Sequence, residues 1–200
     1  MSRTNTSLAA IAAIAALGLA ACSSGTPTPA AQSSAPTSAN ASQASSVSIE
    51  SNDGTVEINL PVTRAASLDN RTFEVLQQWN VPLVAAPKKL IPTTVTAFNG
   101  DDVADVGMHR DPNLEALVAA EPDLIISGQR FTKFDAQIKE LAPNVPMINL
   151  EPRDGMPFNE ELIRQVTDLG TIFNKQAEAQ KLVDDFNASI ERAKKAYDGS

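Results

Sequence analysis

The folded part of the chain begins with an alternation of apolar and polar residues. The alternation runs over residues 47–50 and again over 55–60, on either side of Asn52-Asp53-Gly54. A period of two is typical of strands with one buried face, and Asp-Gly favours a tight turn. These residues therefore predict a β-hairpin.

After the hairpin, short apolar runs alternate with segments of helical period. Helices are expected at 70–79, after Asp111 and at 134–141; strands are expected at 64–68, 82–86, 103–106, 124–126 and 145–150. This alternation predicts an α/β fold, with a mostly parallel sheet covered by helices on both faces. Because such sheets bind ligands beyond the carboxyl ends of their strands, the loops that follow the strands are the places to search for a site.

Local residues suggest how the helices begin and end. Asp111 is expected to cap the middle helix, with Pro112 at its first position and an apolar stripe of Leu114, Leu117 and Val118. Asp69 and Asn70 follow the first strand and are expected to cap the helix after them. Two further helices are expected within residues 158–200, separated by a break at Asn174. The second is longer than most helices of globular domains, which suggests that it connects separate parts of a protein.

The first 46 residues have a different character. Arg3 precedes an apolar run over residues 8–21, which is too short to span a membrane and ends in Leu19-Ala20-Ala21-Cys22. This ending resembles a lipobox, so residues 1–22 are interpreted as a lipoprotein signal peptide with lipidation at Cys22. The alternative is an uncleaved anchor with an incidental cysteine. Residues 23–46, rich in Ser, Ala, Thr and Pro, are expected to be a disordered tether.

Composition narrows the classes of function. The chain has 200 residues and a net charge of −8, so about 150 residues remain for one domain after signal and tether. An acidic chain without a basic stripe is not expected to bind nucleic acid. No G-x-S-x-G, H-E-x-x-H or G-x-G-x-x-G motif occurs, so we do not expect an enzyme.

Three stretches resemble the amino-terminal lobe of iron-siderophore receptors of ABC importers, in which one long helix joins two α/β lobes. They are Val-Gly-Met-His-Arg-Asp-Pro-Asn-Leu-Glu at 106–115, Pro-Asp-Leu-Ile-Ile at 122–126 and Leu-Ala-Pro at 141–143. The resemblance implies a ligand-binding lobe over residues 47–157, a helical segment with the inter-lobe helix over 158–200, and a ferric siderophore as ligand. We expect the C-terminal lobe to be absent from these 200 residues, through truncation of the sequence or of the gene.

The resemblance also implies roles for individual residues. Arg130 matches the family pattern Asp-Leu-Ile-Ile-x-x-x-Arg and is expected to face the ligand, since a guanidinium suits anionic, oxygen-rich complexes. The alternative is a solvated loop arginine. Phe131 either lines the same cleft or belongs to the core.

Three more candidates follow from their place in loops. His109 and Arg110 lie close to the cleft by topology, and Lys88 follows a strand and could steer an anion. Each has the alternative of being a solvated loop residue. As the only histidine, His109 cannot build a metal site alone, so no protein-bound cofactor is expected and iron is held by the siderophore.

Glu115 has a separate expected role. The resemblance implies that it pairs with arginines of the ABC transporter permease; the alternative is a first-turn glutamate favoured by the helix dipole. The lipid anchor on Cys22 would place the protein on the outer face of the cytoplasmic membrane. A receptor for haem or cobalamin, or a truncated noncatalytic scaffold of the cell envelope, remains the alternative function.

Overall fold

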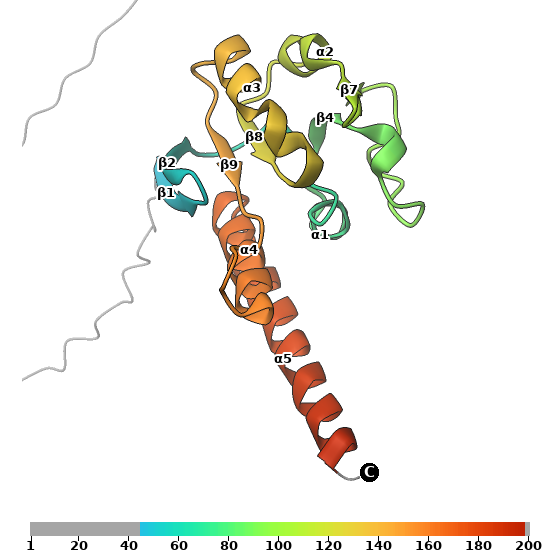
Figure 1. The fold of residues 1–200 in the computed structure, drawn as a ribbon, viewed down its shortest axis with the longest axis vertical. Coiled ribbons are helices and arrows are strands. Elements are labelled where there is room, and N and C mark those ends of the chain that lie inside the picture. The colour runs from blue at the N-terminus through green and yellow to red at the C-terminus, as the bar shows by residue number, and fades with distance from the viewer. Residues whose placement is uncertain (1–44, 199–200) are drawn as a thin grey trace, which may run out of the picture. The chain divides into compact units, whose positions relative to one another are not determined.

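The computed structural model describes residues 45–198, which start with the predicted hairpin (Figure 1). Strands β1 (Ser46–Ser51) and β2 (Gly54–Asn59) pair antiparallel, with Ile49 opposite Val56. Ile49 and Ile58 are buried in the core, as the alternation of apolar and polar residues predicts. The hairpin expected from the sequence is confirmed.

The central element is a five-stranded sheet in the order β5-β4-β3-β8-β9, in which every neighbouring pair is parallel. The strands are β3 (Ala65–Ser67), β4 (Leu83–Ala86), β5 (Ala104–Asp105), β8 (Leu124–Ser127) and β9 (Met147–Asn149). All four residues of β8 are buried, which explains its continuous apolar run. The predicted strands exist, although most are shorter than the apolar runs that mark them.

Two hydrophobic clusters cover the two faces of this sheet. Leu124 and Ile126 pack on one face in a cluster shared with the hairpin, and Ile125 packs on the other. The first cluster includes residues of α1 (Phe73–Gln78), α4 (Phe158–Ile172) and α5 (Gln176–Asp198), and the second includes residues of α2 (Leu114–Ala119), η2 (Gln129–Phe134) and α3 (Asp135–Leu141). The predicted α/β architecture with helices on both faces is therefore confirmed.

The start of α2 differs from the prediction. Asn113, and not Asp111, caps the helix, because its side chain accepts a hydrogen bond of 2.9 Å from the backbone N–H of Ala116. Asp111 and Pro112 instead form β7 (Asp111–Pro112), which pairs antiparallel with β6 (Gly107–Met108). The intervening His109 and Arg110 form the turn of this short hairpin.

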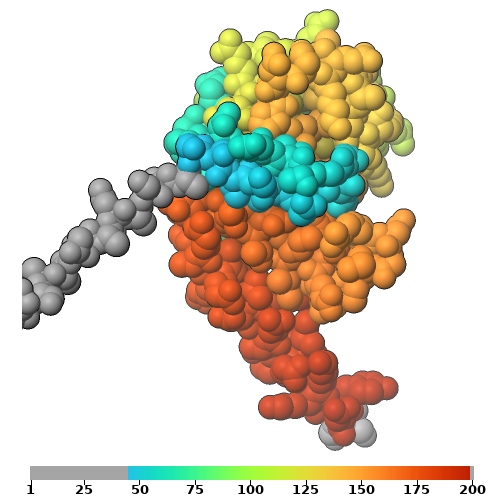
Figure 2. All heavy atoms as spheres, turned by 90° about the vertical axis from the view of Figure 1, so that its left-hand side faces the viewer, coloured from blue at the N-terminus to red at the C-terminus, as the bar shows by residue number. Residues whose placement is uncertain are grey.

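The last two helices run side by side before α5 continues past the rest of the described residues (Figures 1 and 2). Asn174 separates them with a φ of 54°, the left-handed break expected from the sequence. Ala179 of α5 is buried, whereas every residue from 191 to 198 is exposed. Within residues 45–198, no helix is both long and apolar enough to cross a membrane.

Candidate ligand-binding site

The loops at the carboxyl edge of the sheet enclose a small cavity. It has a volume of about 170 Å³ and is lined by Leu68, Asn70, Leu90, His109, Gln129, Arg130 and Phe131. These residues come from the segments that follow β3, β4, β5 and β8, and loops after strands are where the sequence predicts a ligand site. Three predicted site residues, His109, Arg130 and Phe131, are brought together here.

His109 is held at the tip of the β6–β7 hairpin. Gly107 has a φ of 77°, a backbone conformation that residues other than glycine rarely adopt. Its N–H donates to Asp105 Oδ1 at 2.8 Å. The imidazole ring meets Phe131 edge-on, with ring centroids 6.4 Å apart and planes at 79°. Phe131 is only 1% exposed and belongs to the core, so it gives the histidine a rigid surface to pack against. Phe131 also lines the cavity.

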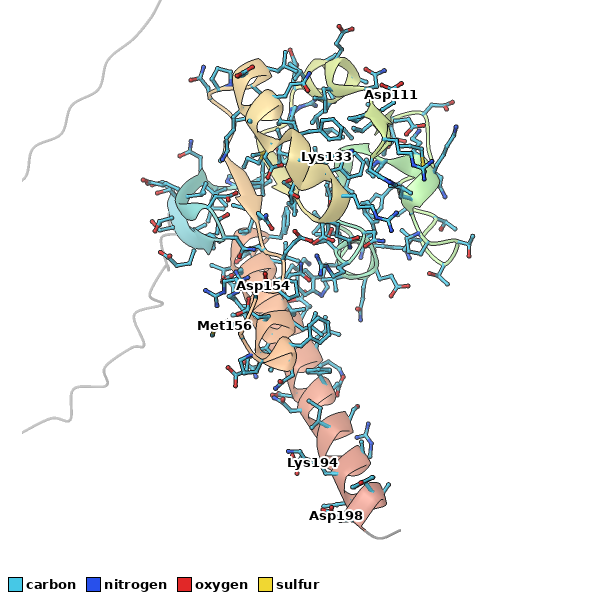
Figure 3. All side chains as sticks on the ribbon, in the orientation of Figure 1. Asp111, Lys133, Asp154, Met156, Lys194 and Asp198 are labelled. Atoms are coloured by element: carbon cyan, nitrogen blue, oxygen red, sulfur yellow. The ribbon has the colours of Figure 1, made fainter. Side chains whose placement is uncertain are left out.

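Positive charges gather around this ring. The pKa of His109 is lowered by burial and then by the charges of Arg130, Lys133 and Arg110. Figure 3 shows Lys133 on the η2–α3 side and Asp111 on the β6–β7 side of this region. Charges that disfavour a cation at the imidazole also favour an anion in the cavity, so the site is suited to an anionic ligand.

A buried carboxylate whose burial the sequence did not reveal lies next to the residues that line the cavity. Asp69 is fully buried, and it accepts hydrogen bonds from Gln129 Nε2 at 3.0 Å, Gln165 Nε2 at 3.1 Å and the N–H of Arg71 at 3.0 Å. It therefore ties the end of β3 to η2 and α4. The prediction that its side chain caps α1 was wrong: the N-cap is Thr72, without a side-chain cap bond, and Thr72 Oγ1 donates to the Asp69 carbonyl at 2.8 Å.

Gly128 allows this close approach of η2 to Asp69. A Cβ at position 128 would lie 2.8 Å from the Asp69 Cβ and 2.9 Å from its Cγ. Only glycine avoids that overlap without a shift of the loop. A glycine directly after a buried strand, with an aspartate after the neighbouring strand, was the available sequence signal for the contact.

The other predicted residues lie outside the cavity lining. Lys88, in η1 (Lys88–Leu90), donates from Nζ to the Gly100 carbonyl at 2.7 Å. Arg110 is exposed beside His109 and acts on it by charge alone. Glu115 is exposed in the first turn of α2 and is not among the residues that line the cavity.

A second buried carboxylate lies where the β9–α4 loop meets α4. Glu161 is 1% exposed, and it accepts from Arg153 Nη2 at 2.6 Å and Arg164 Nη2 at 2.9 Å. The side-chain bonds from Arg153 are the main reason that the pKa of Glu161 falls to about 2. Arg164 also donates to the carbonyl of Glu151 at 2.9 Å and to Asn52 Oδ1 at 3.1 Å, so this network joins α4 to the hairpin turn.

The described side chains offer no cluster for a bare metal ion. Among residues 45–198, no group of three or more His, Cys, Asp or Glu side chains is placed to hold one. The cavity contributes guanidinium, imidazole and amide groups, which suit the oxygen atoms of an anionic ligand.

Comparison with known proteins gives a consistent result. A family model described as periplasmic binding protein matches residues 66–200. The chain is 33% identical over 145 residues to the ferric-anguibactin-binding protein FatB of Vibrio anguillarum, a match that covers 72% of this chain and 45% of FatB.

Solved structures agree in fold. The siderophore-binding protein BauB, solved with ferric iron and two molecules of acinetobactin, superposes with a TM-score of 0.65 at 25% identity, over 74% of this chain and 52% of BauB. The iron uptake ABC transporter substrate-binding protein PiuA of Streptococcus pneumoniae gives 0.70 at 23% identity, over 80% of this chain and 56% of PiuA. This chain thus spans about half the length of the proteins it matches.

Proposed function

The chain belongs to the periplasmic binding protein family, and we propose that it is the substrate-binding lipoprotein of an ABC importer. In this role it captures a ferric siderophore outside the cytoplasm and delivers the complex to a permease. Two similar proteins support this class of ligand: FatB is a ferric-anguibactin-binding protein, and BauB was solved with a complex of acinetobactin and ferric iron.

The observation that carries the proposal is the group of cations around the cavity. Arg130 lines the cavity, and Arg110 and Lys133 lie close enough to lower the pKa of His109. Ferric catecholate and carboxylate complexes carry net negative charge, whereas ferric trihydroxamates are neutral. The site should therefore discriminate between ferric complexes by charge. Iron is held by the siderophore, and the protein binds the outside of the complex.

Two other residues have proposed roles in permease docking and membrane attachment. Glu115 stands exposed on α2, where a carboxylate is available to an arginine of the permease. Cys22 lies outside the described residues, and the lipobox around it supports a lipid anchor on the outer face of the cytoplasmic membrane.

The test is a fluorescence titration of the mature chain without its lipidated Cys22, residues 23–200, with three ferric complexes: a catecholate, citrate and a trihydroxamate. The iron-free forms, haem and cobalamin are titrated in parallel. We expect saturable binding of the anionic ferric complexes and little binding of the trihydroxamate. Preference for haem or cobalamin would assign the site to another ligand, and no binding of any complex would overturn the proposal.

A matched pair of variants locates the binding. Arg130→Ala should weaken binding of the anionic complexes roughly ten- to hundredfold, because a hydrogen bond to a charged group contributes about 1.5–3 kcal/mol. Arg192→Ala, on the exposed part of α5, removes the same charge far along the helix from Ala179 and should leave the affinity unchanged. Equal loss in both variants would mean that only net charge matters.

A further inference from the structure

His109 is fixed in the cavity by its surroundings. It occupies the turn between β6 and β7, and Val106 anchors both ends of that hairpin: its N–H donates to the Ala86 carbonyl at 3.0 Å and its carbonyl accepts from the N–H of Asn113 at 2.7 Å. The ring packs edge-on against Phe131, which is almost fully buried. The imidazole is therefore presented in one place before any ligand arrives.

One nitrogen of this ring is left without a partner. Within the described part of the chain, Nδ1 of His109 is buried and has no hydrogen-bond partner. Protonation of Nδ1 in the ligand-free protein would create a buried N–H without an acceptor, which is costly. The ring also lines the cavity, so the oxygen atoms of a bound ligand are available as acceptors for the protonated ring.

The charged groups on the elements around the ring are mostly cationic. They are Arg110 and Asp111 on the hairpin, Lys88 and Lys89 on η1, Arg130 and Lys133 on η2, and Asp69 and Arg71 after β3. Asp69 is engaged by Gln129, Gln165 and Arg71, and Asp105 binds the N–H groups of Lys88 and Gly107. Burial and the charges of Arg130, Lys133 and Arg110 lower the pKa of His109, so the ring is neutral near pH 7.

We propose that His109 takes up a proton when an anionic ligand enters the cavity, and that the site therefore binds anionic ligands more tightly as the pH falls. The inference rests on the proposed function, because it needs an anionic ligand at this site. A bound anion offsets the cations that keep the ring neutral and gives the imidazolium an acceptor. Binding then includes uptake of a proton.

The sign and size follow from linkage. If the ligand raises the pKa of His109, the complex binds more protons than the free protein, so affinity increases as the pH falls from the pKa in the complex to the pKa in the free protein. Each unit of difference between the two values corresponds to about a tenfold change in affinity. Above both values the ring is neutral in both states and contributes no pH dependence.

The chain offers a direct measurement because it contains a single histidine. The mature chain, purified without a histidine tag and labelled in histidine, gives one imidazole signal in NMR spectra. We would follow this signal from about pH 5 to 8, first alone and then with the diamagnetic gallium(III) complex of 2,3-dihydroxybenzoate as probe. The expected result is a pKa below the ordinary value in the free chain and a rise of about one unit or more with the probe.

Two variants separate this role from a merely structural one. Lys133→Gln should raise the pKa of His109 in the free chain, because it removes one of the charges that lower it. His109→Gln should bind the probe with a flatter pH profile, so that the ratio of the two dissociation constants changes about tenfold between pH 8 and 5.5. Changes in the protonation of the probe itself affect both proteins and cancel in that ratio.

Failure of the inference differs from failure of the proposed function. If the probe binds but the pKa of His109 does not rise, and the pH profiles of wild type and His109→Gln are parallel, the inference is overturned and the proposed function stands. If neither the probe nor any anionic ferric complex binds, both fall.

Discussion

The Glu161 network is open to a quantitative test through the substitution Glu161→Gln. The carboxylate is buried and accepts hydrogen bonds from Arg153 Nη2 at 2.6 Å, Arg164 Nη2 at 2.9 Å and the N–H of Arg153 at 3.0 Å. Glutamine keeps the size of the side chain but removes its charge and half of its acceptor capacity. Arg153 then loses its ionic partner, and Arg164 keeps only the longer ion pair with Asp168, at 3.9 Å.

The size of the effect on stability follows from the pKa of Glu161, which falls from 4.5 to about 2. The main cause is the hydrogen bonding from the side chain of Arg153, and the backbone N–H of Arg153 and the side chain of Arg164 add to it. At about 1.36 kcal/mol per unit, that difference corresponds to roughly 3 kcal/mol. Arg153 is 44% exposed, so solvent screening reduces the figure, and we expect a loss of about 2 kcal/mol in the free energy of unfolding at pH 7.

The pH dependence has a definite sign. A depressed pKa in the folded state means that the stabilisation is complete above about pH 4.5 and is lost as the pH falls towards 2. At pH 3 the difference between wild type and Glu161→Gln should be less than half of its value at pH 7. The midpoint of unfolding of the variant should also depend less on pH in this window.

The assay is urea unfolding followed by tryptophan fluorescence, since Trp79 is the only tryptophan and is 3% exposed. The neighbouring, exposed Glu160→Gln serves as the matched control and should change stability by less than 0.5 kcal/mol or so. An equal loss for Glu161→Gln at pH 7 and pH 3 would show that the stabilisation does not depend on the ionised carboxylate.

Three further predictions concern the contact at Gly128, the end of α5 and the lipid anchor. Gly128→Ala should destabilise the protein by about 1–3 kcal/mol in urea unfolding, because its Cβ would meet Asp69 at 2.8 Å; an unchanged midpoint would contradict that contact. Residues 191–198 of α5, all exposed, should exchange amide hydrogens faster than residues around Ala179, and uniform protection in hydrogen-exchange mass spectrometry would count against this view. Cys22→Ala should release the protein from membranes on fractionation, and full retention would disprove the anchor at this residue.

Much of the fold could be predicted because burial leaves a simple trace in sequence. The apolar run of β8 and the alternation in β1 and β2 reflect which faces are covered. The order of strands and helices then implied a parallel sheet, and Asn174 marked the break between the last two helices. These are local signals, and each is confirmed in its place.

The start of α2 shows where local signals mislead. Asp111-Pro112-Asn113 offers two residues able to cap a helix, and the choice depends on pairing with Gly107 and Met108. That pairing is a contact across a turn whose geometry needs Gly107 at positive φ. Asn113 therefore caps α2, and His109 lies at the tip of the β6–β7 hairpin, where it lines the cavity.

Buried polar groups were the hardest part of the site to predict. Asp69 and Glu161 are typical surface residues by type, and their partners Gln129, Gln165 and Arg153 lie far along the chain or in another element. Burial of a carboxylate becomes favourable only when several donors converge on it. Such convergence depends on tertiary structure, so it leaves no periodic pattern in the sequence of the kind that marks strands and helices.

The central claim is that an anionic metal complex binds in the cavity between the β6–β7 hairpin and η2. Mapping of backbone amide shifts, on adding the gallium(III) dihydroxybenzoate complex to the labelled mature chain, tests this most directly. If the complex binds in this cavity, the largest changes fall on residues 107–111 and 128–133, and Arg130→Ala reduces them. Changes concentrated instead at the apolar groove formed by Val75, Leu162 and Phe186, with residues 107–111 and 128–133 unaffected, would contradict it.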